Sequence, residues 1–225
     1  MIDLTFANTI PGMTCSEELM VISNMASLVP KNGKILEIGS FLGRSCAALH
    51  AGKDPSVTLT VIDPWAWHPS RRHEPFFEGD KSVYDDAIDR AIEKGSFRAG
   101  FEFCLDKILH DIEILQIDSK TFSGHGQYDL IFIDGDHDEP EHDIYSSIGN
   151  NRTLVMGDDF FHDHFPNVRK TVLSSTNKDR ILFYHKAEKT KVWVLIPITG
   201  HWRDNINKVI DAMTIKTSEG ITGHV

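Results

Sequence analysis

Cysteine is scarce in this sequence of 225 residues. The three thiols Cys15, Cys46 and Cys104 are odd in number and form no Cys-x-x-Cys pair, which argues against a disulfide framework and indicates a reducing compartment. Long apolar runs are missing too, because the longest, residues 192–198, is far shorter than the roughly 18 residues of a membrane span. The chain also opens without a basic and then apolar signal pattern. We therefore expect a soluble, cytoplasmic protein.

Positive charge is in short supply as well. The 23 Lys and Arg residues face 33 Asp and Glu residues, which gives a net charge of −10. A chain with this charge repels the phosphates of nucleic acids near neutral pH. We therefore expect neither nucleic acid nor a membrane among the partners, and a small molecule as substrate. The apolar share of 40% is enough for one large domain with its own core.

What the sequence does contain is a regular alternation of short apolar runs with segments of helical spacing. Strands are predicted at residues 34–38, 57–62, 112–117, 130–133 and 153–156, and helices near residues 45–51, 83–92, 97–109 and 140–148. Two further β-rich runs, residues 181–185 and 192–198, flank the charged turn 186–191 and predict a C-terminal antiparallel hairpin. Because repeated βα units imply right-handed crossovers, we predict an α/β fold with a doubly wound, mostly parallel, seven-stranded sheet.

One domain covers residues 1–225 in this interpretation. Residues 1–30 supply a covering helix, residues 64–82 form an insertion, and residues 199–225 form a C-terminal helix and tail. The insertion is rich in tryptophan, phenylalanine, arginine and histidine. It therefore fits a lid over the substrate, and equally a contact between subunits of a homo-oligomer.

A glycine-bearing turn follows the first predicted strand, where an open α/β sheet binds its ligand. Gly39 and Gly43 allow a tight turn around Ser40, and Ser45 can cap the next helix, whose free N–H groups attract an anion. Glu37, which precedes the turn, would repel a pyrophosphate but attract an ammonium group. The methionine end of S-adenosylmethionine carries both a carboxylate and an ammonium group. The turn therefore predicts a site for that cofactor.

Polar residues also end the second and third strands. Asp63 comes about 20 residues after Gly43, where an acidic side chain commonly accepts hydrogen bonds from ribose hydroxyls, and Trp65 is a candidate to pack near the adenosine. Asp118 and Ser119 follow the third strand and are candidates to bracket the adenine. Each of these residues alone fits an ordinary polar strand end equally well. Their combination with the turn favours the cofactor.

Acidic residues follow the fourth and fifth strands. A right-handed crossover places Asp134, Asp158 and Asp159 at one edge of the sheet, where three carboxylates repel each other unless a cation lies among them. Oxygen ligands favour Mg²⁺, with Mn²⁺ or Ca²⁺ as alternatives, although Asp158 or Asp159 can instead cap the following helix. His137, three residues beyond Asp134, is a candidate general base in the same cleft, or a surface histidine that begins a helix.

Together these motifs resemble the class I S-adenosylmethionine-dependent methyltransferases over roughly residues 14–197. Within that class the sequence is similar to the branch of the macrocin- and mycinamicin-type sugar O-methyltransferases and the cephalosporin-hydroxylase-like proteins. The segments that carry this similarity are Glu37-x-Gly39-x-x-x-Gly43-x-Ser45, Ile133-Asp134-Gly135-Asp136-His137 and Gly157-Asp158-Asp159. Phe41 stands where the class usually has glycine, and Asp158 where the branch often has glutamate.

The resemblance implies a Rossmann-like methyltransferase fold and an O-methyltransferase that depends on S-adenosylmethionine and a divalent metal. It assigns the cofactor to Glu37, Gly39 and Asp63, the metal to Asp134, Asp158 and Asp159, and the role of general base to His137. Because a metal and a base together suit an aliphatic hydroxyl, a sugar or polyol-containing natural product is favoured over a catechol as acceptor. Two alternatives stay open: a metal-dependent hydrolase that uses the same aspartates, and a non-catalytic binding module of the same fold.

Overall fold

The computed structural model describes residues 2–66, 78–176, 179–185, 191–214 and 221–224 of the chain. Most of the predicted insertion at 64–82, and most of the predicted turn at 186–191, lie outside these residues. In the part of the chain that the structure describes, no helix combines the length and the apolar character needed to cross a membrane.

The molecule is organised around an eight-stranded sheet with the order β3-β2-β1-β4-β5-β7-β6-β8. The strands are β1 (Lys34–Ile38), β2 (Thr58–Ile62), β3 (Ile112–Leu115), β4 (Leu130–Ile133), β5 (Leu154–Gly157), β6 (Arg180–His185), β7 (Trp193–Pro197) and β8 (Ile221–His224). Strands β1 to β5 pair in parallel, whereas β7 is antiparallel to both β5 and β6. The predicted α/β sheet with its C-terminal hairpin is therefore confirmed.

The C-terminal end differs from the prediction. Instead of a tail alone, Ile221–His224 forms β8, which pairs antiparallel with β6 and extends the seven predicted strands to eight. The segment Ile-Thr-Gly-His is too short, and follows too closely on polar residues, for its period to indicate a strand by itself. The free edge of β6 provides the hydrogen-bonding partner that makes it one.

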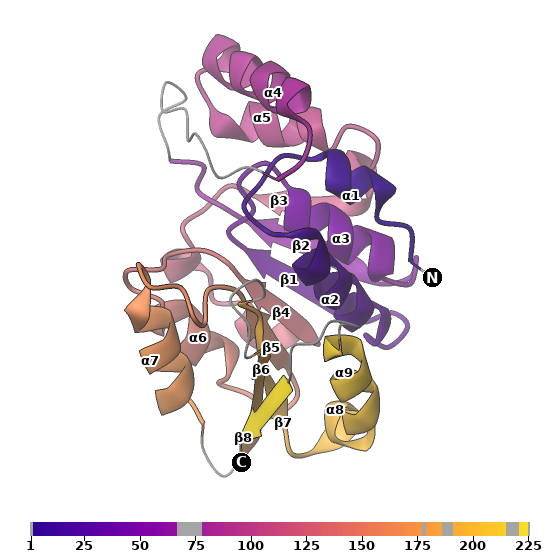
Figure 1. The fold of residues 1–225 in the computed structure, drawn as a ribbon, viewed down its shortest axis with the longest axis vertical. Coiled ribbons are helices and arrows are strands. Elements are labelled where there is room, and N and C mark those ends of the chain that lie inside the picture. Colours follow the sequence, from indigo (N-terminus) through magenta and orange to yellow (C-terminus); the bar gives the residue numbers. More distant parts are fainter. Residues whose placement is uncertain (1, 67–77, 177–178, 186–190, 215–220, 225) are drawn as a thin grey trace.

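Helices cover both faces of the sheet (Figure 1). Figure 1 shows α6 (Glu141–Ser147) and α7 (Pro166–Ser174) on one face, and α2 (Ser16–Ser27), α3 (Arg44–Gly52), α8 (Gly200–Asp204) and α9 (Ile206–Met213) on the other. The pair α4 (Lys81–Lys94) and α5 (Phe97–Cys104) lies beyond the sheet, and α1 (Thr5–Thr9) lies beside α3. Short 3-10 turns are η1 (Leu109–Asp111), η2 (Ser119–Thr121) and η3 (His125–Gln127). Helices α1 and α7 were not predicted, and the helix predicted at 97–109 ends at Cys104.

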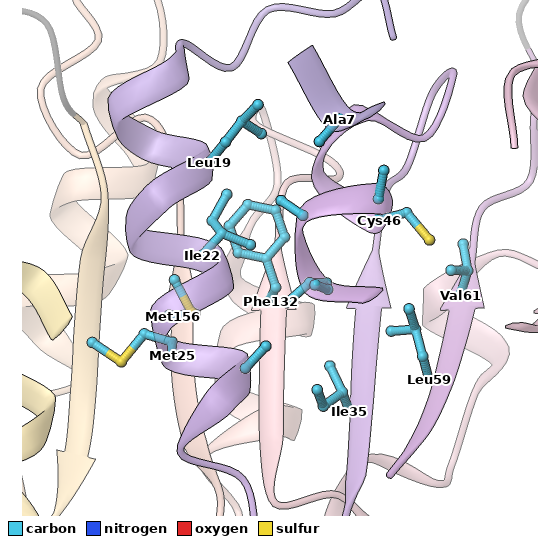
Figure 2. Close-up of a cluster of buried hydrophobic side chains, with 14 of the residues drawn as sticks. Ala7, Leu19, Ile22, Met25, Ile35, Cys46, Leu59, Val61, Phe132 and Met156 are labelled. Atoms are coloured by element: carbon cyan, nitrogen blue, oxygen red, sulfur yellow. The ribbon is translucent and has the colours of Figure 1, made fainter. Parts of the chain in front are cut away.

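The core explains why this arrangement is stable. Leu19, Ile22 and Met25 lie one helical turn apart on α2 and are fully buried against the sheet (Figure 2). Their partners include Ile35 of β1 and Phe132 of β4. Burying a side chain of this size contributes about 1.5–3 kcal/mol. Central strands covered on both faces read as continuous apolar runs, which is why the sequence located them well.

The strand order places the functional site. The chain turns from β1 to β2 on one side, while β4 lies on the other side of β1, so a crevice opens beyond the carboxyl ends of β1 and β4. Pairing of Ile38 with Ile133, and of Ile133 with Gly157, brings the ends of β1, β4 and β5 level. Two hydrogen bonds continue this register beyond the strands, because the N–H of Asp134 donates to Ile38 O at 2.8 Å and the N–H of Asp158 to Ile133 O at 3.3 Å.

Candidate active site

A cavity of about 660 Å³ opens at the carboxyl ends of β1, β2, β4 and β5. Most residues predicted for the cofactor, the metal and the catalysis line it: Gly39, Ser40, Ser45, Asp63, Trp65, Asp118, Ser119, Asp134, His137, Asp158 and Asp159. Predicted residues that do not line the cavity are Glu37 and Gly43. The structure therefore brings predicted residues from the ends of five separate strands, β1 to β5, around one cavity.

The turn after β1 has the backbone geometry that its glycines predict. Gly39 has φ +80°, and a Cβ at this position would lie 2.2 Å from the carbonyl oxygen of Asp134. Gly43 has φ +91° and precedes α3 as its N-cap residue. Because a side chain at Gly39 would collide with rigid backbone, glycine is required where the ends of β1 and β4 approach each other.

Glu37 lies beneath this turn rather than in the crevice. Its side chain is fully buried, Oε2 accepts a hydrogen bond from Ser40 Oγ at 2.6 Å, and Oε1 accepts one from Ser45 Oγ at 2.5 Å. Burial raises the pKa of Glu37 to about 8, and the nearby carboxylates of Asp134 and Asp63 add to the shift. Glu37 therefore contacts the cavity wall from beneath through two serine hydroxyls, and its predicted role toward the ammonium group of the cofactor stays a prediction.

Asp63 ties the end of β2 to the same turn. Its Oδ2 accepts the backbone N–H groups of Ser40 at 2.9 Å and Phe41 at 3.0 Å, and its Oδ1 accepts that of Trp65 at 2.6 Å. Burial raises the pKa of Asp63, while these three hydrogen bonds oppose the shift. A carboxylate offers about four acceptor positions, so about one remains beyond these three hydrogen bonds, and Asp63 lines the cavity.

Aromatic side chains pack the turn against the outer helices. Trp65 donates its Nε1–H to Phe41 O at 2.9 Å, and its ring lies 4.9 Å from the ring of Phe101 on α5. Phe41, with φ 49°, packs its ring 5.7 Å from that of Phe97. The left-handed backbone at Phe41 is one that glycine adopts readily, and the tilted ring contact with Phe97 helps to hold a phenylalanine there.

The acidic cluster differs in membership from the predicted one. His137 Nε2 lies 3.7 Å from Asp134 Oδ1 and 3.5 Å from Asp159 Oδ2, and one ligand atom from each of the three residues lies within 4.8 Å of the others. Asp158 lies outside this group, and its Oδ1 accepts the N–H of Asp159 at 2.7 Å. Among the described residues the structure groups Asp134, His137 and Asp159, and the predicted metal role of Asp158 stays a prediction.

Burial dominates the electrostatics of this cluster. It raises the pKa of Asp134 to about 8, with the charge of Asp159 adding to the shift. It lowers the pKa of His137, although the neighbouring carboxylate of Asp159 opposes that change. The imidazole is therefore neutral at pH 7 and can accept a proton. The His137 ring lies 4.4 Å from the ring of Phe165 and faces the carboxylates. It is therefore not the surface histidine that the sequence allowed as an alternative.

The donor set suits a divalent cation. Two carboxylate oxygens and an imidazole nitrogen at these separations can share one ion, with positions left for water or a substrate oxygen. Mg²⁺ prefers oxygen ligands alone, whereas Mn²⁺ also accepts imidazole, so the observed set is compatible with either ion depending on whether His137 joins it.

Two contributors to the site were missed by the sequence reasoning. Lys191, which precedes β7, lines the cavity and places its Nζ 3.3 Å from Asp159 Oδ1. The segment Pro11–Thr14 forms another wall, and the buried guanidinium of Arg44 holds it through backbone carbonyls. Neither Lys191 nor the segment Pro11–Thr14 follows the carboxyl end of a predicted strand, so no local sequence pattern predicts that they line the site.

Comparison with known proteins agrees with this geometry. Residues 36–156 match the family model described as a methyltransferase domain. The chain therefore belongs to the methyltransferase-domain family. A comparison with curated proteins gives no match.

Solved structures share the fold at low sequence identity. The O-methyltransferase TomG from Streptomyces achromogenes, involved in tomaymycin synthesis and solved with S-adenosylmethionine, is 16% identical with TM-score 0.53, over 83% of this chain and 82% of that one. The Podospora anserina methyltransferase PaMTH1, solved with S-adenosylhomocysteine, is 15% identical with TM-score 0.51, over 80% and 76%. CalS11, the TDP-rhamnose 3'-O-methyltransferase of calicheamicin biosynthesis, is 16% identical with TM-score 0.50, over 80% and 79%. At these identities the likeness establishes the shared fold.

Proposed function

We propose that this chain transfers the methyl group of S-adenosylmethionine to a hydroxyl group of a small molecule, and that the acceptor is a sugar or another polyol-containing natural product. The observation that carries the proposal is the single cavity that joins the glycine turn after β1 to His137, Asp134 and Asp159. Two reactants bound in one cavity can be held in line, which is worth roughly 7–11 kcal/mol of the barrier.

In this proposal the turn and the strand ends hold the cofactor. The N-terminus of α3, capped by Gly43 and beside Ser45, receives the carboxylate of the methionine end. The remaining acceptor position of Asp63 receives a ribose hydroxyl, and Asp118 and Ser119 border the adenine. Asp118 is already ordered, because its Oδ1 accepts the N–H of Lys120 at 2.8 Å and so caps η2.

The reaction itself is a direct displacement. The acceptor oxygen attacks the sulfonium methyl group, a C–O bond forms, the C–S bond breaks, and S-adenosylhomocysteine leaves with the electron pair. The hydroxyl proton passes to Nε2 of His137, which is neutral at pH 7 because burial lowers its pKa. Such a base typically contributes 10²- to 10⁴-fold in rate.

We further propose that Asp134 and Asp159 hold a divalent cation beside the acceptor. When bound, such a cation lowers the pKa of a coordinated hydroxyl, which helps an aliphatic alcohol more than a phenol. His137 Nε2 faces the same point, and one nitrogen cannot ligate the ion and accept the proton at once. We assign His137 to the proton, so that the cation has carboxylate ligands only.

Substitution of His137 separates these roles. His137→Ala should lower kcat by about 10²- to 10⁴-fold, while the affinities for S-adenosylmethionine and Mn²⁺, measured by titration calorimetry, stay within about threefold of wild type. A tenfold loss of Mn²⁺ affinity would make His137 a metal ligand instead of the base. A similar loss of cofactor affinity would contradict its placement on the acceptor side.

The same titrations decide between the proposal and its alternatives. We expect S-adenosylmethionine to bind, and the bound cofactor to be consumed when nucleotide sugars, polyols and catechols are supplied as acceptors with Mg²⁺ or Mn²⁺. A hydrolase would show no affinity for the cofactor. A binding module would take up the cofactor and transfer nothing to any acceptor.

A further inference from the structure

Lys191 places a positive charge at the acidic cluster. Its Nζ lies 3.3 Å from Asp159 Oδ1, and its side chain lines the same cavity as Asp134 and His137. Sequence separation hides this contact, because Lys191 comes 32 residues after Asp159. The side chain of Asp159 is 10% exposed and that of Lys191 29% exposed, so the pair is partly shielded from water.

Hydrogen bonds at both its N–H and its C=O fix the backbone of Lys191, so the position of its side chain does not depend on the contact with Asp159 alone. Its N–H donates to Glu18 Oε1 at 2.9 Å, and its C=O accepts the N–H of Phe160 at 3.0 Å. Glu18 is itself buried on α2 and accepts the N–H of Cys15 through its other oxygen at 2.8 Å. Three segments therefore converge to fix the base of the lysine side chain: α2, the residues that follow β5, and the residues that precede β7.

The two carboxylate oxygens of Asp159 are divided between two partners. Oδ1 pairs with Lys191, while Oδ2 faces His137 at 3.5 Å. A divalent cation between Asp134 and Asp159 would therefore meet Oδ2 of Asp159 beside His137, Oδ1 already paired with Lys191, and the positive charge of that lysine a few ångströms away.

We propose that Lys191 is an internal competitor for the cation site: its ammonium group neutralises Asp159 when no divalent ion is bound, and it weakens the binding of such an ion. This inference rests on the cation site of the proposed function and names the residue that sets its affinity. The cluster then stays assembled without a metal, and a divalent ion exchanges readily instead of remaining as a permanent constituent of the fold.

The expected size of the effect follows from charge alone. The ammonium group lies a few ångströms from the proposed ion, and the effective dielectric constant is taken as that of a protein surface. Removing this unit charge then strengthens the binding of a divalent ion by at least about tenfold. Lys191→Met keeps the length and the apolar stem of the side chain and removes the charge. Lys191→Arg keeps the charge. Lys120→Met is a matched control, because Lys120 lines the same cavity but pairs with Asp136 and Glu139.

The test is titration calorimetry with MnCl₂ alone, without cofactor or acceptor. Lys191→Met should bind Mn²⁺ at least tenfold more tightly than wild type, and Lys191→Arg and Lys120→Met should stay within about threefold. Equal or weaker Mn²⁺ binding by Lys191→Met would overturn the inference, as would an equal gain in Lys120→Met. If Lys191→Met does not fold, as judged by circular dichroism, Lys191→Gln takes its place with the same criterion.

Thermal unfolding with and without Mn²⁺ gives a second readout that does not depend on enzymatic activity. Without metal, Lys191→Met should unfold at a lower temperature than wild type, because Asp159 loses its counter-charge, and Mn²⁺ should raise its Tm by more than it raises that of wild type. An equal response of the two proteins to Mn²⁺ would refute the competitor role. Failure of every variant to bind Mn²⁺ would instead refute the cation site itself, while binding of S-adenosylmethionine in a separate titration tests the methyltransferase assignment independently.

Discussion

Replacing Glu37 by glutamine should change the pH dependence of stability in a calculable way. In the folded protein burial raises the pKa of this carboxyl group from its ordinary value of 4.5 to about 8. A group with a raised pKa binds its proton more tightly when folded, so its stabilising contribution is complete below pH 4.5 and is lost as the pH rises through about 8. At 1.36 kcal/mol for each pKa unit, the wild type should lose about 3 kcal/mol between pH 6 and pH 9 through this group alone.

The assay is urea unfolding of the cofactor-free protein at both pH values, for wild type and Glu37→Gln. Glutamine is neutral and can still hydrogen-bond with Ser40 and Ser45, so the variant should lack this part of the decline and should exceed wild type in stability at pH 9. Glu93→Gln, on an exposed side chain of α4, is the control for loss of one negative charge. An identical pH slope in Glu37→Gln and wild type would refute the burial argument.

Cofactor affinity should fall in the same variant. A bound ammonium group above the turn favours the ionised form of Glu37 and so lowers its raised pKa. Glu37→Gln cannot ionise, so it should bind S-adenosylmethionine about tenfold more weakly or worse. A variant that is more stable at alkaline pH yet binds more weakly distinguishes this role from a packing defect, which would lower both quantities.

Two further substitutions test the architecture around the cavity. Gly39→Ala should abolish cofactor binding in calorimetry, because its Cβ would lie 2.2 Å from Asp134 O. Gly95→Ala is the control, because Gly95 has φ +67° and no atom within 4 Å of the added Cβ. It should lower the free energy of unfolding only by the left-handed strain of about 1–2 kcal/mol. Arg44→Met should lower the free energy of unfolding in urea by about 3 kcal/mol or more, since the carbonyls of Thr14 and Ile10 lose donors at 2.7 and 2.6 Å; a loss below 1 kcal/mol would contradict the buried role of its guanidinium.

The sheet could be predicted from the sequence because each of its central strands is marked by residues within the strand itself. Each central strand is buried on both faces, so it reads as an apolar run, and the polar residue that ends it marks the edge where ligands bind. This reasoning placed Gly39, Asp63 and Asp134 on one cavity without coordinates. It did not find β8, whose pairing depends on an edge 36 residues or more before it in the chain.

Side-chain direction within the site was less predictable. Spacing places Asp158 and Asp159 together at the end of β5, but it does not say which of them faces Asp134. The left-handed backbone of Asp159, with φ 66°, turns its carboxylate toward His137, while the carboxylate of Asp158 folds back onto the next N–H group. Likewise, the motif places Glu37 at the end of β1 without showing that two serine hydroxyls cover it.

Backbone strain links these departures to function. Phe41, Trp65 and Asp159 are non-glycine residues with φ of 49°, 43° and 66°, and all three line the cavity. Each such conformation costs on the order of 1–3 kcal/mol and persists only where its surroundings enforce it. Here Asp63 accepts the N–H groups of both Phe41 and Trp65, and Lys191 pairs with the carboxylate of Asp159. Asp63, proposed to bind the ribose, and Lys191, proposed to compete with the cation, thus also hold these strained residues in place. Substituting either one should therefore disturb the cavity wall in addition to removing its own contact with the ligand.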